Sequence, residues 1–97
     1  MPAFQLSRKA VEDLKDIGRH TTKQWGREQR NRYLGQLDSQ FQALAADPDR
    51  GRECSHIREG YRRYPSGRHV IYYRQLSADR IEIVRVLHDR MEPERHL

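Results

Sequence analysis

Apolar residues in the first half of the chain recur at helical spacing. A first stripe consists of Val11, Leu14 and Ile17. A second, at steps of three and four, consists of Tyr33, Leu37, Phe41 and Leu44. Each stripe predicts an amphipathic helix, with Ser7 as the N-cap of the first. Gly26 should separate the two helices. Asp47-Pro48 should end the second, because the residue before a proline avoids the helical region.

The second half of the chain has the composition of strands. Residues 61–64, 68–74 and 80–87 are rich in β-branched and aromatic side chains and predict three strands. Pro65-Ser66-Gly67 and residues 76–79 predict the turns between them. Residues 48–56 are polar and predict a loop, whereas Phe4-Gln5-Leu6 predicts a short strand before the first helix.

Residues 80–87 form the strongest predicted strand. Alternation places Ile81, Ile83, Arg85 and Leu87 on one face and Glu82, Val84, Val86 and His88 on the other. Both faces carry apolar residues. We therefore expect a central strand, or one whose outer face another element covers.

These elements predict one α+β domain over residues 1–97. An N-terminal strand, a helical hairpin and a three-stranded antiparallel meander should form two layers, with the hairpin on one face of the sheet. A chain of 97 residues is long enough for a single modest core.

Positive charge is concentrated in one segment. The chain is 35% hydrophobic and 34% charged, with a net charge of +5. Residues 50–74 contain seven arginines and two glutamates, so they hold the whole excess. Arginine outnumbers lysine by sixteen to three, and its planar fork binds carboxylates and phosphates through two hydrogen bonds. The segment indicates a surface for a large acidic partner; the alternative is that the charge serves only solubility.

Several classes of chemistry lack support in the sequence. Cys54 is the single cysteine, so no internal disulfide can form. The five histidines show no metal-ligand spacing, and no phosphate-binding glycine loop or nucleophile elbow is present. We expect no metal and no cofactor. No signal-peptide core or long apolar run occurs, which predicts a cytoplasmic protein with no membrane partner.

Acid–base cleavage of RNA is the remaining catalytic candidate. It needs a base, an acid and cations at the phosphate. The residues available for these roles are His69, His88, Arg85, Arg68 and Glu82. Alternation along the strand separates His88 from Arg85, which disfavours a shared site. The structural alternatives are a hydrogen-bonded strand-end role for His88 and a cross-strand pairing of His69 with Tyr61 or Tyr64.

Aromatic residues divide into two groups. Trp25, Tyr33 and Phe41 are expected in the core. The sheet tyrosines alternate with arginines in a pattern typical of interfaces, and they could also stack on RNA bases or be half-buried sheet residues. These are Tyr61, Tyr64, Tyr72 and Tyr73.

Taken together, the motifs resemble those of the ParE toxins in the RelE/ParE superfamily. The matching pieces cover nearly the whole chain. They include Leu6-Ser7, Asp13-Leu14, Thr21-Thr22, Trp25-Gly26, Leu44-Ala45, Ile57-Arg58, Gly60-Tyr61-Arg62-Arg63, residues 67–74, residues 83–88 and Met91. The order and spacing of these pieces carry the resemblance, since each alone is unspecific.

This resemblance implies a non-catalytic toxin that inhibits DNA gyrase and blocks replication. It also implies a ParD-type ribbon-helix-helix antitoxin that binds operator DNA, with the toxin reaching DNA only through it as co-repressor. RelE-like relatives instead cut messenger RNA on the ribosome. Those relatives use basic, histidine and tyrosine residues near the C-terminus, whereas here Asp89 follows His88 and no tyrosine follows Tyr73. This departure weighs against a ribonuclease function.

Two surfaces follow as hypotheses. The expected target-binding residues are Arg62, Arg63, Arg68, Arg85, His88 and Arg90. The expected antitoxin-binding residues are Trp25, Tyr33, Tyr61 and Tyr72, near the helical hairpin or a sheet edge. The alternatives are a ribosome-dependent mRNA endonuclease and a member that has lost toxicity and survives as a co-repressor.

Overall fold

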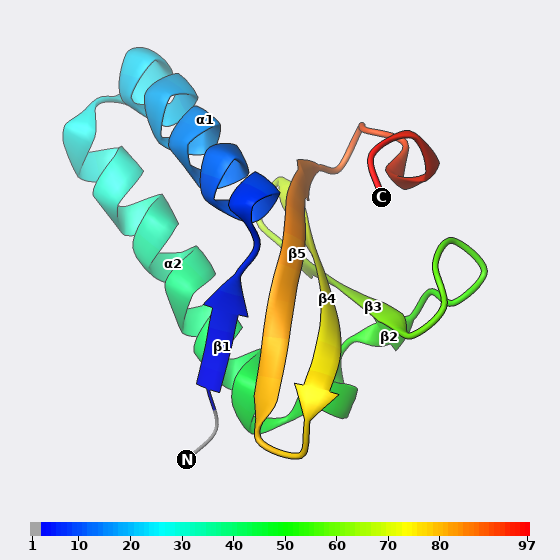
Figure 1. Cartoon of the computed structure of the whole chain (residues 1–97). Helices are drawn as coiled ribbons and strands as arrows, with labels where there is room; N and C mark the ends of the chain where they lie inside the picture. Colours follow the sequence, from blue (N-terminus) through cyan, green and yellow to red (C-terminus); the bar gives the residue numbers. More distant parts are fainter. Residues whose placement is uncertain (1–2) are drawn as a thin grey trace.

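In the computed structural model, two helices pack on one face of a five-stranded sheet (Figure 1). The structure describes residues 3–97; Met1 and Pro2, which begin the stretch without signal-peptide character, lie outside it. The elements in order are β1 (Ala3–Leu6), α1 (Arg8–Trp25), α2 (Arg27–Ala46), a 3-10 helix (Pro48–Arg50), β2 (Arg52–Glu53), β3 (Tyr61–Ser66), β4 (His69–Ser77), β5 (Arg80–His88) and a 3-10 helix (Pro93–Arg95). The predicted two-layer α+β architecture is confirmed.

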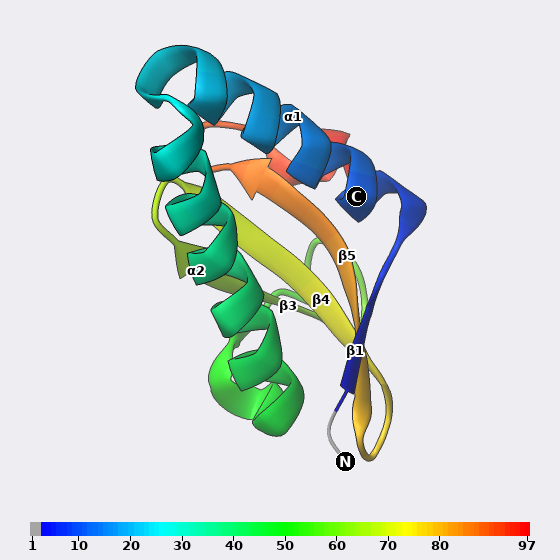
Figure 2. The ribbon, with the colours of Figure 1, turned by 90° about the vertical axis from the view of Figure 1, so that its left-hand side faces the viewer.

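The sheet has the strand order β1-β5-β4-β3-β2. β2 to β5 pair antiparallel, whereas β1 pairs parallel to β5 with Phe4 opposite Ile81. β5 therefore lies between β1 and β4, which confirms its predicted central position. In the view of Figure 2, α1 and α2 lie together across one side of the twisted sheet.

The helical hairpin begins and ends where its sequence predicts. The Ser7 hydroxyl accepts a hydrogen bond from the Ala10 amide at 3.0 Å, as expected of an N-cap. The same hydroxyl donates to the carbonyl of Val84 at 2.6 Å, so the start of α1 is fastened to β5. Gly26 separates the helices at φ +90, a conformation that favours glycine. Asp47 ends α2 as predicted.

Two hydrophobic clusters lie on opposite faces of the sheet. The larger one packs both helices against the sheet; its largest members include Leu37, Phe41, Leu44, Ile71, Tyr73, Ile81 and Ile83. The smaller one, on the outer face, consists of Cys54, Val70, Tyr72 and Leu87, with Ile57, Tyr61 and Leu97 beside it. The turn over residues 54–60 and the C-terminal residues thus cover part of the outer face (Figure 1).

A β-bulge at Val84 changes the predicted faces of β5. Tyr72 pairs with Arg85, but its neighbour Tyr73 pairs with Ile83, which leaves Val84 as an extra residue. The bulge reverses the alternation, so Val86 joins Ile81 and Ile83 in the helix-side core. The predicted faces are therefore wrong beyond Val84.

The β2–β3–β4 region also differs from its prediction. Residues 52–53, in the predicted loop, form β2 and pair with β3. Pro65 and Ser66 belong to β3, and Gly67 and Arg68 alone make the turn. Gly67 has φ +60, which suits the first position of a tight hairpin turn. Pro65 is tolerated because β2 does not extend to it. The amide hydrogen that a proline lacks is therefore not needed for a hydrogen bond between strands.

Candidate functional site

An ion pair between Asp13 of α1 and Arg85 of β5 joins the helical layer to the sheet. The Asp13 carboxylate accepts hydrogen bonds from Arg85 Nε at 2.8 Å and Nη2 at 2.9 Å, and from the Val86 amide at 3.0 Å. Arg85 Nη1 donates to the His96 carbonyl at 2.9 Å. The hydrogen bonds to Asp13 raise the pKa of Arg85. Arg85 is thus a structural residue, which corrects its predicted place on a target surface.

A cavity of about 790 Å³ lies between the two helices and the ends of β4 and β5. Its lining includes Ile17, His20, Trp25, Tyr33, Arg68, His69, Val86, His88 and Met91. The Tyr33 hydroxyl lies 2.6 Å from His69 Nδ1 and accepts from the Arg68 amide at 3.1 Å. The rings of His69 and His88 meet edge to face with centroids 5.5 Å apart. His69 therefore pairs with Tyr33 of α2, not with Tyr61 or Tyr64 as the sequence suggested.

His69 is uncharged at neutral pH. Burial, and then the neighbouring His88, lower its pKa to about 4. Burial raises the pKa of Tyr33, so the phenol keeps its proton at neutral pH. The tautomer of His69 sets which of the two groups donates in their hydrogen bond. His88 Nδ1 lies 3.1 Å from Asp89 Oδ1 and 3.2 Å from the Arg90 amide. His88 is the hydrogen-bonded strand-end residue that the structural alternative described.

The residues considered for RNA cleavage are divided by the fold. His69, His88 and Arg68 line the same cavity. Arg85 is held by Asp13, and Glu82 binds Arg74 at 2.9 Å on the outer face. His88 and Glu82 were predicted on one side of β5; the bulge at Val84 puts them on opposite sides.

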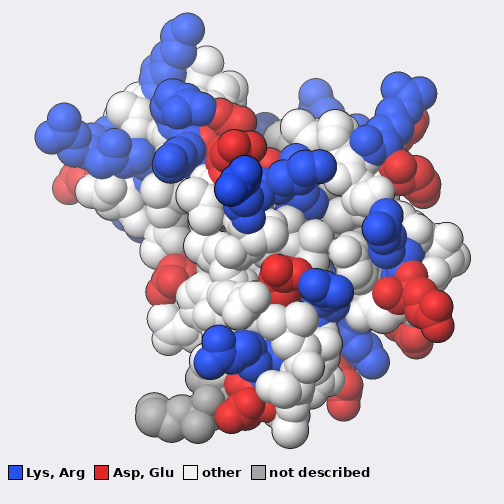
Figure 3. Space-filling model, viewed as in Figure 1, with Lys and Arg blue, Asp and Glu red and all other residues white. Residues whose placement is uncertain are grey.

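The predicted target-binding residues do not form one surface. Arg62 donates to the Gly51 carbonyl at 2.8 Å and lies 3.5 Å from Asp49. Arg63 lies on the outer face, its guanidinium carbon 5.8 Å from the centre of the Tyr72 ring. Arg68, His88 and Arg90 cluster at the end of β5, where the Asp89 amide donates to the Arg68 carbonyl. Figure 3 likewise shows Lys and Arg spread over one face, with Asp and Glu among them.

The predicted antitoxin-binding residues also separate. Trp25 is 73% exposed at the rim of the cavity, so its predicted core position is wrong. It is the last residue of α1, and no hydrophobic cluster in residues 3–97 includes it. Tyr72 is only 2% exposed, which excludes it from a contact surface in this conformation. Tyr61 lies half-buried beside it on the outer face.

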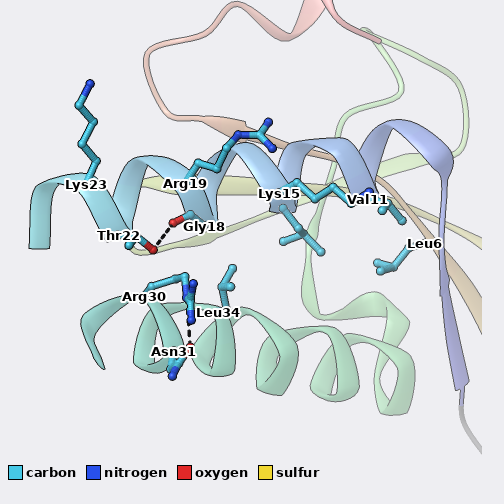
Figure 4. Close-up of a pocket in the computed structure, with 11 residues that line it drawn as sticks. Leu6, Val11, Lys15, Gly18, Arg19, Thr22, Lys23, Arg30, Asn31 and Leu34 are labelled. Atoms are coloured by element: carbon cyan, nitrogen blue, oxygen red, sulfur yellow. Dashed lines mark hydrogen bonds between the residues drawn. The ribbon is translucent and has the colours of Figure 1, made fainter. Parts of the chain in front are cut away.

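An open groove between α1 and α2 is the surface that sequence reasoning missed (Figure 4). It has a volume of about 800 Å³, and Leu6, Val11, Leu14 and Leu34 give it an apolar lining. Four cations border it: Lys15, Arg19, Lys23 and Arg30. In Figure 4, Arg30 and Leu34 of α2 point toward α1. The signal in the sequence was the repeat of cations at four-residue steps along α1, beside the apolar stripe.

Within the described part of the chain, no group of three or more His, Cys, Asp or Glu side chains could hold a metal ion. No helix between residues 3 and 97 is both long enough and apolar enough to cross a membrane.

Comparison with solved structures identifies the class of fold. The protein resembles a chain described as "Chromosomal ParDE TA system from P. aeruginosa", with a TM-score of 0.74 and 21% sequence identity. The match covers 91% of this chain and 96% of the other. The α+β architecture is therefore RelE/ParE-like.

Sequence comparison gives the family. Residues 4–93 match the family described as "ParE toxin of type II toxin-antitoxin system, parDE". Toxin ParE1 of Caulobacter vibrioides is 40% identical over 97 residues, covering 100% of this chain and 99% of that protein. Toxin ParE1 of Mycobacterium tuberculosis is 39% identical, covering 97% and 96%. The chain belongs to the ParE toxin family and is the toxin component of a type II toxin–antitoxin system.

Proposed function

We propose that the protein blocks replication by binding DNA gyrase in the cytoplasm, without itself breaking a covalent bond, and that a ParD-type antitoxin neutralises it. The observation that carries this proposal is the match of residues 4–93 to the ParE toxin family, the toxins of parDE systems. A P. aeruginosa structure of the same fold is described as a ParDE system. The antitoxin would be a ribbon-helix-helix protein that binds operator DNA, with the toxin as its co-repressor.

The division of the candidate catalytic groups supports a binding function over RNA cleavage. A ribonuclease needs cations close to the phosphate. Arg85 is already paired with Asp13, and Asp89 lies beside His88, where its charge would repel a phosphate. Tyr33 and His69 bond to each other. Of the two arginines considered for RNA cleavage, Arg68 is thus the one that could still bind a phosphate in the cavity.

The groove between α1 and α2 is the proposed antitoxin site. Its apolar lining matches one face of an amphipathic helix, and its border of lysines and arginines matches acidic residues along the edges of such a helix. Val11 is 36% exposed there, so a partner would remove apolar surface from water. The site replaces the surface expected from Tyr61 and Tyr72.

An assay with purified components tests the target. Purified toxin should reduce supercoiling by gyrase and leave messenger RNA intact in a translating ribosome mixture. Cleaved transcripts with normal supercoiling would instead support the endonuclease. Unimpaired growth of cells that hold soluble toxin without antitoxin would support the co-repressor alternative.

Charge reversal tests the antitoxin site separately. The Lys15→Glu/Lys23→Glu variant should still inhibit gyrase but bind antitoxin at least tenfold more weakly. Arg27→Glu/Arg32→Glu, which changes the same charge on α2, is the control and should keep its antitoxin affinity. Equal affinities for both variants and the wild type would rule out the groove.

A further inference from the structure

Two arginines face each other directly on the outer face of the sheet. Arg52 of β2 pairs with Arg63 of β3 in antiparallel register. Arg63 lies over the ring of Tyr72, a member of the outer-face cluster, so its side chain is on that face. Directly opposed residues of an antiparallel pair project to the same side, with Cβ atoms roughly 5 Å apart. Arg52 and Arg63 therefore form an adjacent pair of cations, here called the arginine pair.

Neither member of the arginine pair forms an ion pair within residues 3–97. Three other arginines of the sheet have a carboxylate partner: Arg62 has Asp49, Arg74 has Glu82 and Arg85 has Asp13.

The nearest carboxylate in sequence does not compensate the pair. Glu53 pairs with Arg62 in the ladder, so it points to the other face, and its carboxylate accepts a hydrogen bond from the Ser55 hydroxyl at 2.9 Å. Like charges directly opposite each other destabilise a sheet. A bound anion would relieve this repulsion.

The stacking of Arg63 prepares it for a ligand. Tyr72 is buried and its ring is fixed in the outer-face cluster. The guanidinium over that ring has lost part of its conformational freedom before any ligand binds, which lowers the entropic cost of binding. Arg52, by contrast, is exposed and can adjust to the ligand.

We propose that the arginine pair binds phosphodiester groups of duplex DNA, so that the toxin contacts DNA itself. A guanidinium matches phosphate through two hydrogen bonds. One carboxylate on a protein could bind one or both guanidinium groups, but it would bring only a single negative charge to the two cations. DNA carries closely spaced charges by its nature, about one per 1.7 Å of helix axis. The inference goes beyond inhibition of gyrase, because the family relation assigns no DNA contact to this chain.

Salt dependence of DNA binding tests the site. Fluorescence anisotropy would measure the affinity of the full-length toxin for a labelled 20-base-pair duplex at several salt concentrations. Arg52→Gln/Arg63→Gln should bind at least tenfold more weakly at low salt. The slope of log affinity against log salt should fall by about 1.8, since each lost phosphate contact removes about 0.9.

A control of equal charge separates a site from general attraction. Arg27→Gln/Arg32→Gln removes two exposed helical arginines and should leave the salt slope unchanged. Equal losses in both variants would overturn the proposal, because net charge alone would then explain binding. Arg52→Gln alone provides a second test in which the stacked Arg63 is retained, and its slope should fall by about 0.9.

Two further assays distinguish the source of the DNA and keep this inference separate from the proposed function. A weaker toxin–antitoxin complex on an operator fragment would identify operator DNA, and weaker recruitment to gyrase-bound DNA would identify target DNA. If Arg52→Gln/Arg63→Gln loses gyrase inhibition but keeps its DNA salt slope, the pair binds a protein, the phosphate site is wrong and gyrase inhibition stands. If the slope falls but the wild type does not inhibit gyrase, the phosphate site stands alone.

Discussion

The carboxylate of Asp13 and the guanidinium of Arg85 bind each other through two hydrogen bonds across 72 positions of sequence. The contact lies just beyond the end of β1, where one edge of β5 no longer has a neighbouring strand. There Asp13 accepts the hydrogen bond from the Val86 amide that another strand would have accepted. Arg85 also holds the His96 carbonyl, so one pair of residues joins α1, β5 and the C-terminal segment.

Loss of either partner should destabilise the protein strongly. The Asp13 and Arg85 side chains are 13% and 15% exposed, and an uncompensated charge at such a site costs about 3 kcal/mol. Arg85→Ala should therefore be comparable to Ile83→Ala, for which truncation of a buried isoleucine costs about 2–5 kcal/mol. An Arg85 on an exposed target surface, as the sequence predicted, would have made Arg85→Ala the milder of the two. Urea unfolding of both variants measures the difference.

An exposed ion pair on the same helix is the control for this prediction. Asp16 binds Arg19, but both side chains are largely exposed. Asp16→Asn should change the free energy of unfolding by less than about 0.5 kcal/mol. If Asp13→Asn behaved in the same way, the pair between α1 and β5 would have no structural role.

Gly51 and Tyr73 should show strong coupling in stability. The Gly51 amide donates to the Tyr73 hydroxyl at 2.8 Å, and the hydroxyl donates to the Pro48 carbonyl at 2.7 Å. A Cβ at position 51 would lie 2.8 Å from both the Arg63 carbonyl oxygen and a Tyr73 ring carbon, and closer still to the Tyr73 hydroxyl. Gly51→Ala should cost about 1–3 kcal/mol through overpacking.

A double-mutant cycle checks this coupling. Tyr73→Phe alone should destabilise the protein by about 1–3 kcal/mol because the buried Gly51 amide loses its acceptor. In Gly51→Ala/Tyr73→Phe the loss of the hydroxyl removes the closest of the three contacts of the new methyl group, so the double variant should be more stable than the sum of the two changes implies. Strict additivity would contradict the close approach of the two residues.

Trp25→Ala should leave the fold intact. Since the indole is 73% exposed, we expect a change in the free energy of unfolding within about 0.5 kcal/mol. Leu37→Ala, at a position 1% exposed in α2, should cost about 2–5 kcal/mol. Thermal unfolding of the two variants would make the comparison. A large loss for Trp25→Ala would restore the core position that the sequence suggested.

Local patterns predicted the helices because both their boundaries and their buried faces depend on neighbouring residues. Ser7, Gly26 and Asp47 mark the ends, and the stripe from Leu37 to Leu44 is buried as expected. The sheet required more than local information. Two residues suffice for β2 only because β3 pairs with them, and the bulge at Val84 depends on the register with β4.

The candidate site was less predictable for the same physical reason. The side chains of Arg85 and Trp25 are of types found both buried and exposed, and residues distant in sequence determine which of the two occurs. Asp13, far away in sequence, holds Arg85, whereas Trp25 ends a helix at a place that no hydrophobic cluster of the described chain reaches. The arginine pair likewise depends on the unpredicted β2. The excess charge of residues 50–74 was visible in the sequence, but its arrangement on the surface was not.

Acid should weaken the fold through His69. In the native protein its pKa is lowered to about 4, whereas in the unfolded chain it should be near 6.5. As pH falls from about 6.5 toward 4, the unfolded chain takes up a proton that native His69 does not, so stability is lost over this window and is fully present above it. The full shift corresponds to roughly 3 kcal/mol. Because the ring is only half-buried, solvent screening should reduce the loss to about 1–2 kcal/mol.

Urea unfolding at pH 7.5 and pH 5 measures this loss. His69→Gln removes the titrating ring and retains a side-chain amide that can either donate to or accept from the Tyr33 hydroxyl. The variant should lose less stability on acidification than the wild type. Every other side chain is the same in both proteins, so the difference between the two slopes isolates His69. Identical slopes would show that native His69 binds a proton as readily as it does in the unfolded chain.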